Sequence, residues 1–149
     1  MPAFLALLAA ATPVAGTAPP VPARAEHVAI QAADIDRSAT FYREAFGLRP
    51  IAQPMRTRRW LDLGTGLALH ILDGRTAPRA SNRDEHLALH VADRAPVTAW
   101  LDRHGVEWTD RAGKPRTMQT RFDGVRQIYV RDPDGYWIEV GDDRGTPAR

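Results

Sequence analysis

The 149-residue chain contains no cysteine, which excludes a disulfide framework, a thiolate nucleophile and any sulfur-ligated metal. A metal ion would therefore need nitrogen and oxygen ligands. A surplus of charge of one sign is also lacking, because 20 Lys and Arg face 18 Asp and Glu and leave a formal net charge of +2. We therefore expect no nucleic-acid partner.

Long apolar runs are missing as well. The run at residues 4–11 is too short to cross a bilayer, so no membrane span is expected. Its length is typical of a signal-peptide core, and Ala23-Arg24-Ala25 has the small-x-small form of a cleavage site. We predict that residues 1–25 are a signal peptide and that the protein is periplasmic or secreted. The alternative is a Pro-rich, disordered extension of a cytoplasmic domain.

The chain contains an internal repeat. The sequence EHVAIQAAD at residues 26–34 returns as EHLALHVAD at residues 85–93, with five of nine positions identical. A W-x5-G-x3-H pattern that ends at His70 also returns as Y-x5-G-x3-E, which ends at Glu139. Two related modules therefore lie in one chain.

Both copies predict the same order of elements: a strand, a helix, and two or three further strands. The first helix has Asp34 or Asp36 as its cap and ends at Gly47, while Gly105 ends the second. We predict an α+β fold of two modules, each with a strand, a helix and two or three further strands. The expected boundaries are 26–143 for the domain, with module one at 26–74, a linker at 75–84, module two at 85–143 and a tail at 144–149.

Four side chains with metal-binding atoms recur at equivalent places on the opening and closing strands of the two modules, namely His27, His70, His86 and Glu139. The alternation of each strand places them opposite its apolar face, so they point into the curved interior of the sheet. A pseudo-twofold relation between the modules then brings all four together. Three imidazoles and one carboxylate suit one divalent ion, such as Zn, Ni, Co, Mn or Fe.

The chain resembles the vicinal oxygen chelate superfamily, which includes glyoxalase I, extradiol dioxygenases, fosfomycin-resistance thiol transferases and metal-free bleomycin-resistance proteins. The motifs that carry this resemblance are HVAI from His27, DRSATFYREAFGL from Asp36, HLAL from His86 and IYVRDPDGYWIE, which ends at Glu139. The resemblance implies paired βαβββ modules and a metal ion at their shared cleft. It also implies a small-molecule substrate and a homodimer whose modules pair across subunits.

Among these proteins, glyoxalase I is the most similar in its ligand positions, which correspond to His27, His70, His86 and Glu139. The resemblance implies a metal-dependent lyase or isomerase acting on a small carbonyl compound or its thiol adduct, glutathione adducts among them. Glu139 would shuttle a proton between adjacent carbons through an enediolate. In glyoxalase I the position of His70 is usually Glu, and a glutathione-binding Arg usually stands at Gln31.

Further candidate substrate contacts lie on the same strands and on one loop. His90 and Trp137 share a strand face with the predicted ligands, and Tyr129 matches a tyrosine of the dioxygenase signature. An anion-binding cover formed by the loop at residues 111–124 would use Lys114, Arg116 and Arg121. Solvated loop charges are the alternative explanation for these three residues.

The resemblance leaves three other functions open. An extradiol dioxygenase would use His27, His86 and Glu139 as a facial triad, with His70 as a second-sphere acid or base. A fosfomycin-type thiol transferase would also leave His70 unused as a ligand. A metal-free protein would sequester a planar or hydrophobic ligand in the same cleft.

Overall fold

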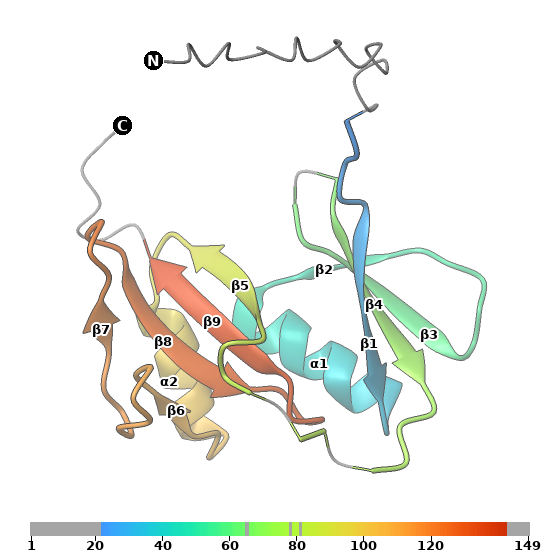
Figure 1. The fold of residues 1–149 in the computed structure, drawn as a ribbon. Coiled ribbons are helices and arrows are strands. Elements are labelled where there is room, and N and C mark those ends of the chain that lie inside the picture. Colours follow the sequence, from blue (N-terminus) through green and yellow to red (C-terminus); the bar gives the residue numbers. More distant parts are fainter. Residues whose placement is uncertain (1–21, 65, 78, 81, 143–149) are drawn as a thin grey trace, which may run out of the picture.

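The computed structural model describes residues 22–64, 66–77, 79–80 and 82–142, and Figure 1 shows two βαβββ-like modules side by side. The proposed signal peptide and the tail at 144–149 lie almost wholly outside the described residues. Among the described residues, no helix has the length and apolar character needed to span a membrane. The first strand begins at His27, beside the expected start of the domain.

Module one is a four-stranded sheet with one helix. Its strands lie in the order β1-β4-β3-β2, with β1 parallel to β4 and the other pairs antiparallel. Its elements are β1 (His27–Ala32), α1 (Ile35–Phe46), β2 (Arg49–Ile51), β3 (Arg58–Asp62) and β4 (Ala68–Asp73). The register pairs His70 with Ala29 on one side and with Trp60 on the other, so these residues form one row across the sheet.

Module two repeats this plan with one additional short strand. Its main order is β5-β9-β8-β6, with β5 parallel to β9, and β7 pairs with β8. Its elements are β5 (His86–Val91), α2 (Ala95–Arg103), β6 (Trp108–Thr109), β7 (Gln119–Thr120), β8 (Arg126–Arg131) and β9 (Trp137–Asp142). Glu139 pairs with Ala88 on one side and Tyr129 on the other.

The ends of α1 follow the local chemistry of the sequence. Of the two candidate caps, Asp34 is the one used, because its side chain accepts hydrogen bonds from the backbone of Asp36 and Arg37. Gly47 ends the helix in the left-handed conformation, with φ of 69°, which glycine adopts without a steric penalty.

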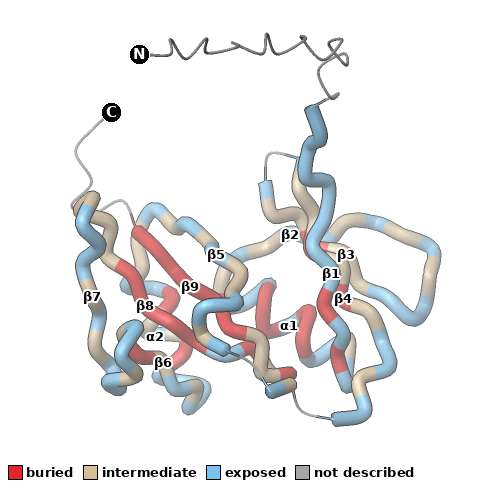
Figure 2. The backbone as a smooth tube through the Cα atoms, in the orientation of Figure 1, coloured by how far each residue is buried: buried red, intermediate tan, exposed pale blue. Residues whose placement is uncertain are grey.

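The apolar faces of the sheets and the two helices share one core. Buried residues of both modules join in a single cluster, and Figure 2 shows the burial concentrated on α1, β8 and β9. The helices touch each other, with Phe41 and Trp100 in edge contact at 5.7 Å between ring centroids. The modules therefore meet through their helices, on the side of each sheet opposite to the predicted metal ligands.

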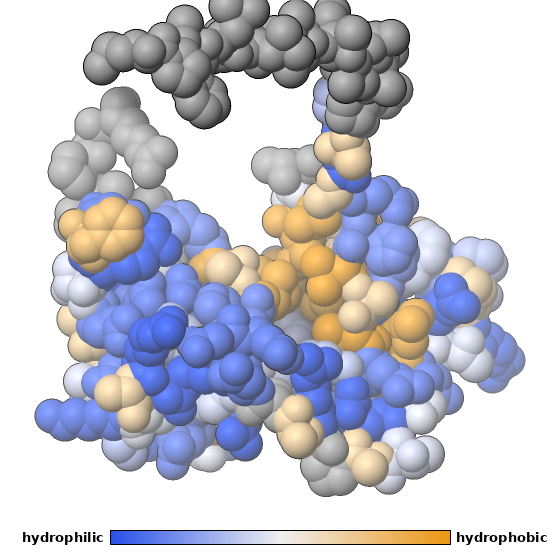
Figure 3. Space-filling model, in the orientation of Figure 1, coloured by the Kyte–Doolittle hydropathy of each residue, from blue (hydrophilic) through white to orange (hydrophobic). Residues whose placement is uncertain are grey.

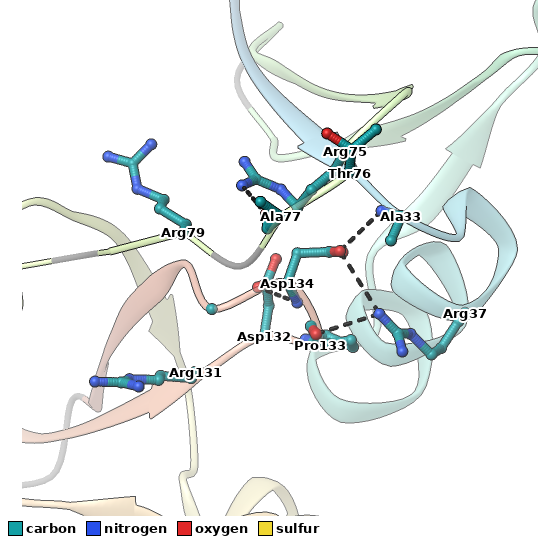
Figure 4. A pocket seen from close by; sticks show the side chains of 11 residues that line it. Ala33, Arg37, Arg75, Thr76, Ala77, Arg79, Arg131, Asp132, Pro133 and Asp134 are labelled. Atoms are coloured by element: carbon teal, nitrogen blue, oxygen red, sulfur yellow. Dashed lines mark hydrogen bonds and ion pairs between the residues drawn. The ribbon is translucent and has the colours of Figure 1, made fainter.

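The turn between β8 and β9 also joins the modules. Oδ1 of Asp134 accepts a hydrogen bond from the backbone of Ala33 at 2.9 Å, and Oδ2 accepts one from Ser38 at 2.6 Å. Asp132 accepts a hydrogen bond from the hydroxyl of Tyr42 at 2.9 Å. Figure 4 shows this turn against the start of α1. Oδ1 of Asp132 also accepts hydrogen bonds from the backbone of Asp134 and Tyr136, so the turn is closed locally and also holds α1 against module two.

Candidate functional site

The first pair of predicted ligands lies on the exposed face of the module-one sheet. The rings of His27 and His70 stack with centroids 4.2 Å apart, and Trp60 stacks on the other side of His70 at 4.3 Å. Nδ1 of His27 lies 2.5 Å from Oε2 of Glu26. Because the carboxylate accepts from Nδ1, the Nε2 atom of His27 is left to bind a metal ion.

The position of His70 within this stack affects its protonation. Burial lowers the pKa of His70 below its ordinary value, and the neighbouring His27 adds to this effect. The neutral imidazole is therefore favoured, and this is the form that binds a metal ion.

The second pair lies on the corresponding face of module two. Nε2 of His86 is 3.3 Å from Oε2 of the buried Glu139. Nδ1 of His86 donates to the backbone oxygen of Arg83 at 2.9 Å. This contact fixes the tautomer, so that in neutral His86 the free lone pair on Nε2 faces the carboxylate.

Tyr129 positions the carboxylate of this second pair. Its hydroxyl donates to Oε2 of Glu139 at 2.6 Å and accepts from Gln127 at 2.8 Å. Its ring meets that of His86 edge-on, with centroids 5.6 Å apart. Burial and the hydrogen bond to Glu139 raise the pKa of Tyr129 to about 12, so its hydroxyl remains a donor at neutral pH.

Within one chain the four predicted ligands form two pairs rather than one group. Among the residues that the structure describes, no three His, Cys, Asp or Glu side chains lie close enough to hold one metal ion. The expected convergence of all four is therefore not met inside a single subunit. The reason is the helix-mediated contact between modules, which leaves the two ligand-bearing faces without a direct contact.

The chemistry of each pair nevertheless fits a divalent cation. Together the pairs offer three imidazoles and one carboxylate, and second partners fix the orientation of His27, His86 and Glu139. Hydrogen-bonded outer partners of this kind are typical of metal-binding histidines and carboxylates.

The other predicted substrate contacts fall in different places. Trp137 lies beside the second pair, and the guanidinium carbons of Arg83 and Arg131 lie 4.3 and 4.5 Å from its ring centroid. Arg121 reaches the second pair, with Nη1 3.7 Å from Oε1 of Glu139. Arg116 instead bonds Asp102 at 3.0 Å, beside α2.

Three remaining candidates lie at the margins. The side chain of Gln31 bonds the backbone oxygen of Asp73 at 3.5 Å, next to the first pair on β1. His90 is exposed on β5 and borders an apolar groove. Lys114 is exposed on the loop between β6 and β7, and its backbone bonds Asp110.

Sequence reasoning missed the arginines of the segment that joins the modules. Arg75 and Arg79 lie over the ring of Tyr136, and Arg83 lies over Trp137. It also missed Arg111, whose side chain interacts electrostatically with Tyr129 and Glu139. Arg75, Arg79 and Arg83 recur every fourth residue, and this spacing could have indicated a shared role. The position of Arg111 depends on tertiary structure alone.

An apolar groove separates the two sheets along their edge strands. Figure 3 shows apolar surface gathered between the two lobes of the molecule. One cavity of about 370 Å³ is lined by residues of both β1 and β5, including Val28 and His86, and a second of about 280 Å³ includes Leu67 and Leu89. Each of these strands lies at the edge of its sheet.

A further cavity of about 430 Å³ lies at the junction of the modules (Figure 4). Four arginines line it, but none of the predicted metal ligands does. Arg75 is bound internally by the backbone oxygens of Gln31 and Ala77. Arg37 bonds the backbone oxygen of Pro133 at 3.2 Å. These contacts join the lining arginines to backbone of both modules at the junction.

With the fold and both ligand pairs described, comparison with known proteins identifies the family. The model of the Glyoxalase/Bleomycin resistance protein/Dioxygenase superfamily matches residues 24–140. The chain belongs to this superfamily. Its α+β fold of two βαβββ-like modules, expected from the sequence, is confirmed.

Individual relatives carry different activities. Glyoxylase I 4 of Arabidopsis thaliana is 25% identical over 76% of this chain and 67% of its own length. Metallothiol transferase FosB of Shouchella clausii is 25% identical, with 76% of each chain covered. The structure of oxidase ChaP-H1 has a TM-score of 0.68 and 25% identity, covering 81% of this chain and 96% of that one.

A lactoylglutathione lyase from Agrobacterium tumefaciens shares the fold, with a TM-score of 0.57 and 22% identity over 83% of this chain and 96% of that one. Members of the superfamily are mostly enzymes that act on small molecules, typically with a divalent metal ion.

Proposed function

We propose that this protein is a metal-dependent lyase or isomerase of the glyoxalase I type, which moves a proton between adjacent carbons of a small carbonyl compound or its thiol adduct. One observation carries the proposal. Two pairs of predicted ligands support it, the half-sites His27 with His70 and His86 with Glu139, because in each pair a histidine is bonded through Nδ1 and Nε2 is the nitrogen left for a metal ion.

The complete site then requires two subunits. A homodimer would set the His27 face of one protomer against the Glu139 face of its partner. The apolar groove along β1 and β5 supports this arrangement, because it exposes Val28 beside two sheet edges that another chain can cover. A two-fold interface would create two equivalent sites.

The roles of the residues follow from their contacts. A divalent cation held by the four ligands would stabilise negative charge on the substrate oxygens. Glu139 takes the proton from one carbon and returns it to the next, while Tyr129 holds Oε2 in place through its hydrogen bond. Oε1 faces Arg121 across 3.7 Å and is the oxygen left for proton transfer.

Metal content tests this proposal directly. The protein is purified without chelator, incubated with a mixture of Mn, Fe, Co, Ni and Zn salts, and subjected to elemental analysis. We expect about one ion per chain in the wild type and almost none in Glu139→Ala. Absence of a stoichiometric ion would contradict the proposal and favour a metal-free, ligand-sequestering protein.

A second candidate is an oxygen-dependent ring-cleaving enzyme. The arrangement around His70 favours it, because this ring is sandwiched between Trp60 and His27 and would be available as a second-sphere acid or base. The similarity to oxidase ChaP-H1 points the same way. Iron as the bound metal, together with oxygen consumption in the presence of a catechol, would favour this candidate over the isomerase.

A further inference from the structure

Arg121 borders the Glu139 half-site and is anchored from outside by an acidic residue. Its Nε and Nη2 atoms bond the two carboxylate oxygens of Asp123 at 2.9 and 2.5 Å. The remaining Nη1 atom faces the site and lies 3.7 Å from Oε1 of Glu139. This distance is about 1 Å longer than a charge-assisted hydrogen bond, so Glu139 does not saturate the inner arm.

Arg111 is anchored in a similar way. Its Nη2 atom lies 2.7 Å from Oδ1 of Asp84, and its guanidinium also interacts electrostatically with Tyr129. Nη1 of Arg83 donates to the backbone oxygen of Arg111 at 2.6 Å and so holds this part of the loop against the joining segment. Tyr129 and, more weakly, Glu139 raise the pKa of Arg111, so its guanidinium lies within electrostatic range of both.

We propose that Arg111 and Arg121 form an oxyanion subsite, which binds a carboxylate or phosphate group of the substrate next to Glu139. The inference rests on the proposed function and narrows its substrate to an anionic carbonyl compound. The two arginines come from opposite ends of the segment at residues 111–121, and both interact electrostatically with the carboxylate of Glu139. External anchors on both guanidinium groups reduce the entropy lost when they bind a ligand.

The local charges support an anionic ligand. Asp84 and Asp123 are bound on the outer side of the arginines, and Glu139 is the acidic group on the inner side. A divalent cation bound to Glu139 would leave the inner surface with an excess of positive charge. An anionic group on the substrate would compensate this charge and would bind bidentately to a guanidinium.

Calorimetric titration with simple probes tests the subsite. Pyruvate supplies a carbonyl group and a carboxylate, and methyl pyruvate is its uncharged counterpart. We expect wild-type protein loaded with Mn²⁺ to bind pyruvate at least about tenfold more tightly than the ester. Equal affinity for the two compounds would overturn the inference. Inorganic phosphate that binds more tightly than pyruvate in competition would assign a phosphorylated substrate. Phosphate that binds more weakly than pyruvate would assign a carboxylate substrate.

Variants connect the binding to the two arginines. Arg111→Met and Arg121→Met should each lose about tenfold in pyruvate affinity, while the lysine variants should retain part of it. Arg103→Met is the matched control, because this exposed residue in the last turn of α2 carries the same charge. An equal loss in Arg103→Met would show a general charge effect and would overturn the subsite. Circular dichroism confirms that each variant is folded.

A parallel titration without metal separates this inference from the proposed function. Failure to bind any of Mn, Fe, Co, Ni and Zn would contradict the proposed function, whereas arginine-dependent anion binding by the metal-free protein would still support the subsite. Normal Mn²⁺ binding without discrimination between pyruvate and its ester would overturn the subsite alone.

Discussion

The hydroxyl of Tyr129 donates a 2.6 Å hydrogen bond to Oε2 of Glu139, and this contact joins two neighbouring strands in the middle of the module-two sheet. Without this bond the carboxylate would keep only its longer contacts to His86 and Arg121, at 3.3 and 3.7 Å. The bond thus fixes the group to which we assign both metal binding and proton transfer.

Tyr129→Phe should therefore weaken metal binding by about ten- to hundredfold, as is typical when an outer partner of a ligand is removed. The overall fold should be retained, because the phenylalanine ring fills the same volume. Competition with a fluorescent chelator measures the affinity. Unchanged metal affinity would show that Tyr129 does not orient the carboxylate.

Mixing two inactive variants tests whether the site spans two subunits. His27→Ala removes a ligand from one half-site and Glu139→Ala removes a ligand from the other, so each homodimer should lack a complete site. When equal amounts are unfolded and refolded together, half of the dimers are mixed and each contains one intact site. We expect about a quarter of the wild-type metal content.

Separately refolded samples of the two variants, combined afterwards under conditions that prevent exchange, serve as the control for this mixing. Metal content that stays at the level of the single variants after joint refolding would place each site within one chain.

Tyr42→Phe tests the junction between the modules. Burial and the neighbouring Asp132 raise the pKa of Tyr42 well above its ordinary value, so the folded state favours the neutral phenol. This contribution to stability is complete below the ordinary tyrosine pKa and is lost as the pH rises from about 10 upward. The substitution should cost about 1–3 kcal/mol at neutral pH, because Oδ2 of the buried Asp132 loses its donor.

Urea unfolding at several pH values measures both effects of Tyr42→Phe. The variant should show a weaker decline in stability above pH 10 than the wild type, with Tyr129 accounting for part of what remains. Parallel curves for the two proteins over this range would contradict the assignment of the alkaline sensitivity to Tyr42.

Strand periodicity and the internal repeat were sufficient to predict that the two side chains of each pair lie together. The alternation within β5 and β9 places His86 and Glu139 on one face, and the parallel register then brings their side chains together. The same reasoning holds for His27 and His70 on β1 and β4. Local patterns therefore carry the information for contacts made within one sheet.

The relation between the half-sites could not be predicted in this way. It depends on the packing of α1 against α2 and on the bonds of Asp134 to Ser38 and Ala33, which join segments far apart in the sequence. Local turn chemistry is enough to explain the turn at residues 132–135. Its second role, which is to hold α1 against module two, has no signal in the sequence pattern. Arg111 likewise reaches Tyr129 through loop geometry that no periodic pattern encodes.

His70→Ala distinguishes the two candidate reactions through the function of this ring. As a ligand, His70 contributes one of four donors, so its loss should weaken metal affinity by about tenfold or more and should lower activity with it. As a second-sphere group, His70 would leave metal affinity unchanged while activity falls. Trp60→Phe is the matched control, because it changes the ring stacked on His70 and retains every donor. Weakened metal binding in His70→Ala with normal binding in Trp60→Phe would support the four-ligand site and the isomerase, since the facial triad of the dioxygenase uses only His27, His86 and Glu139.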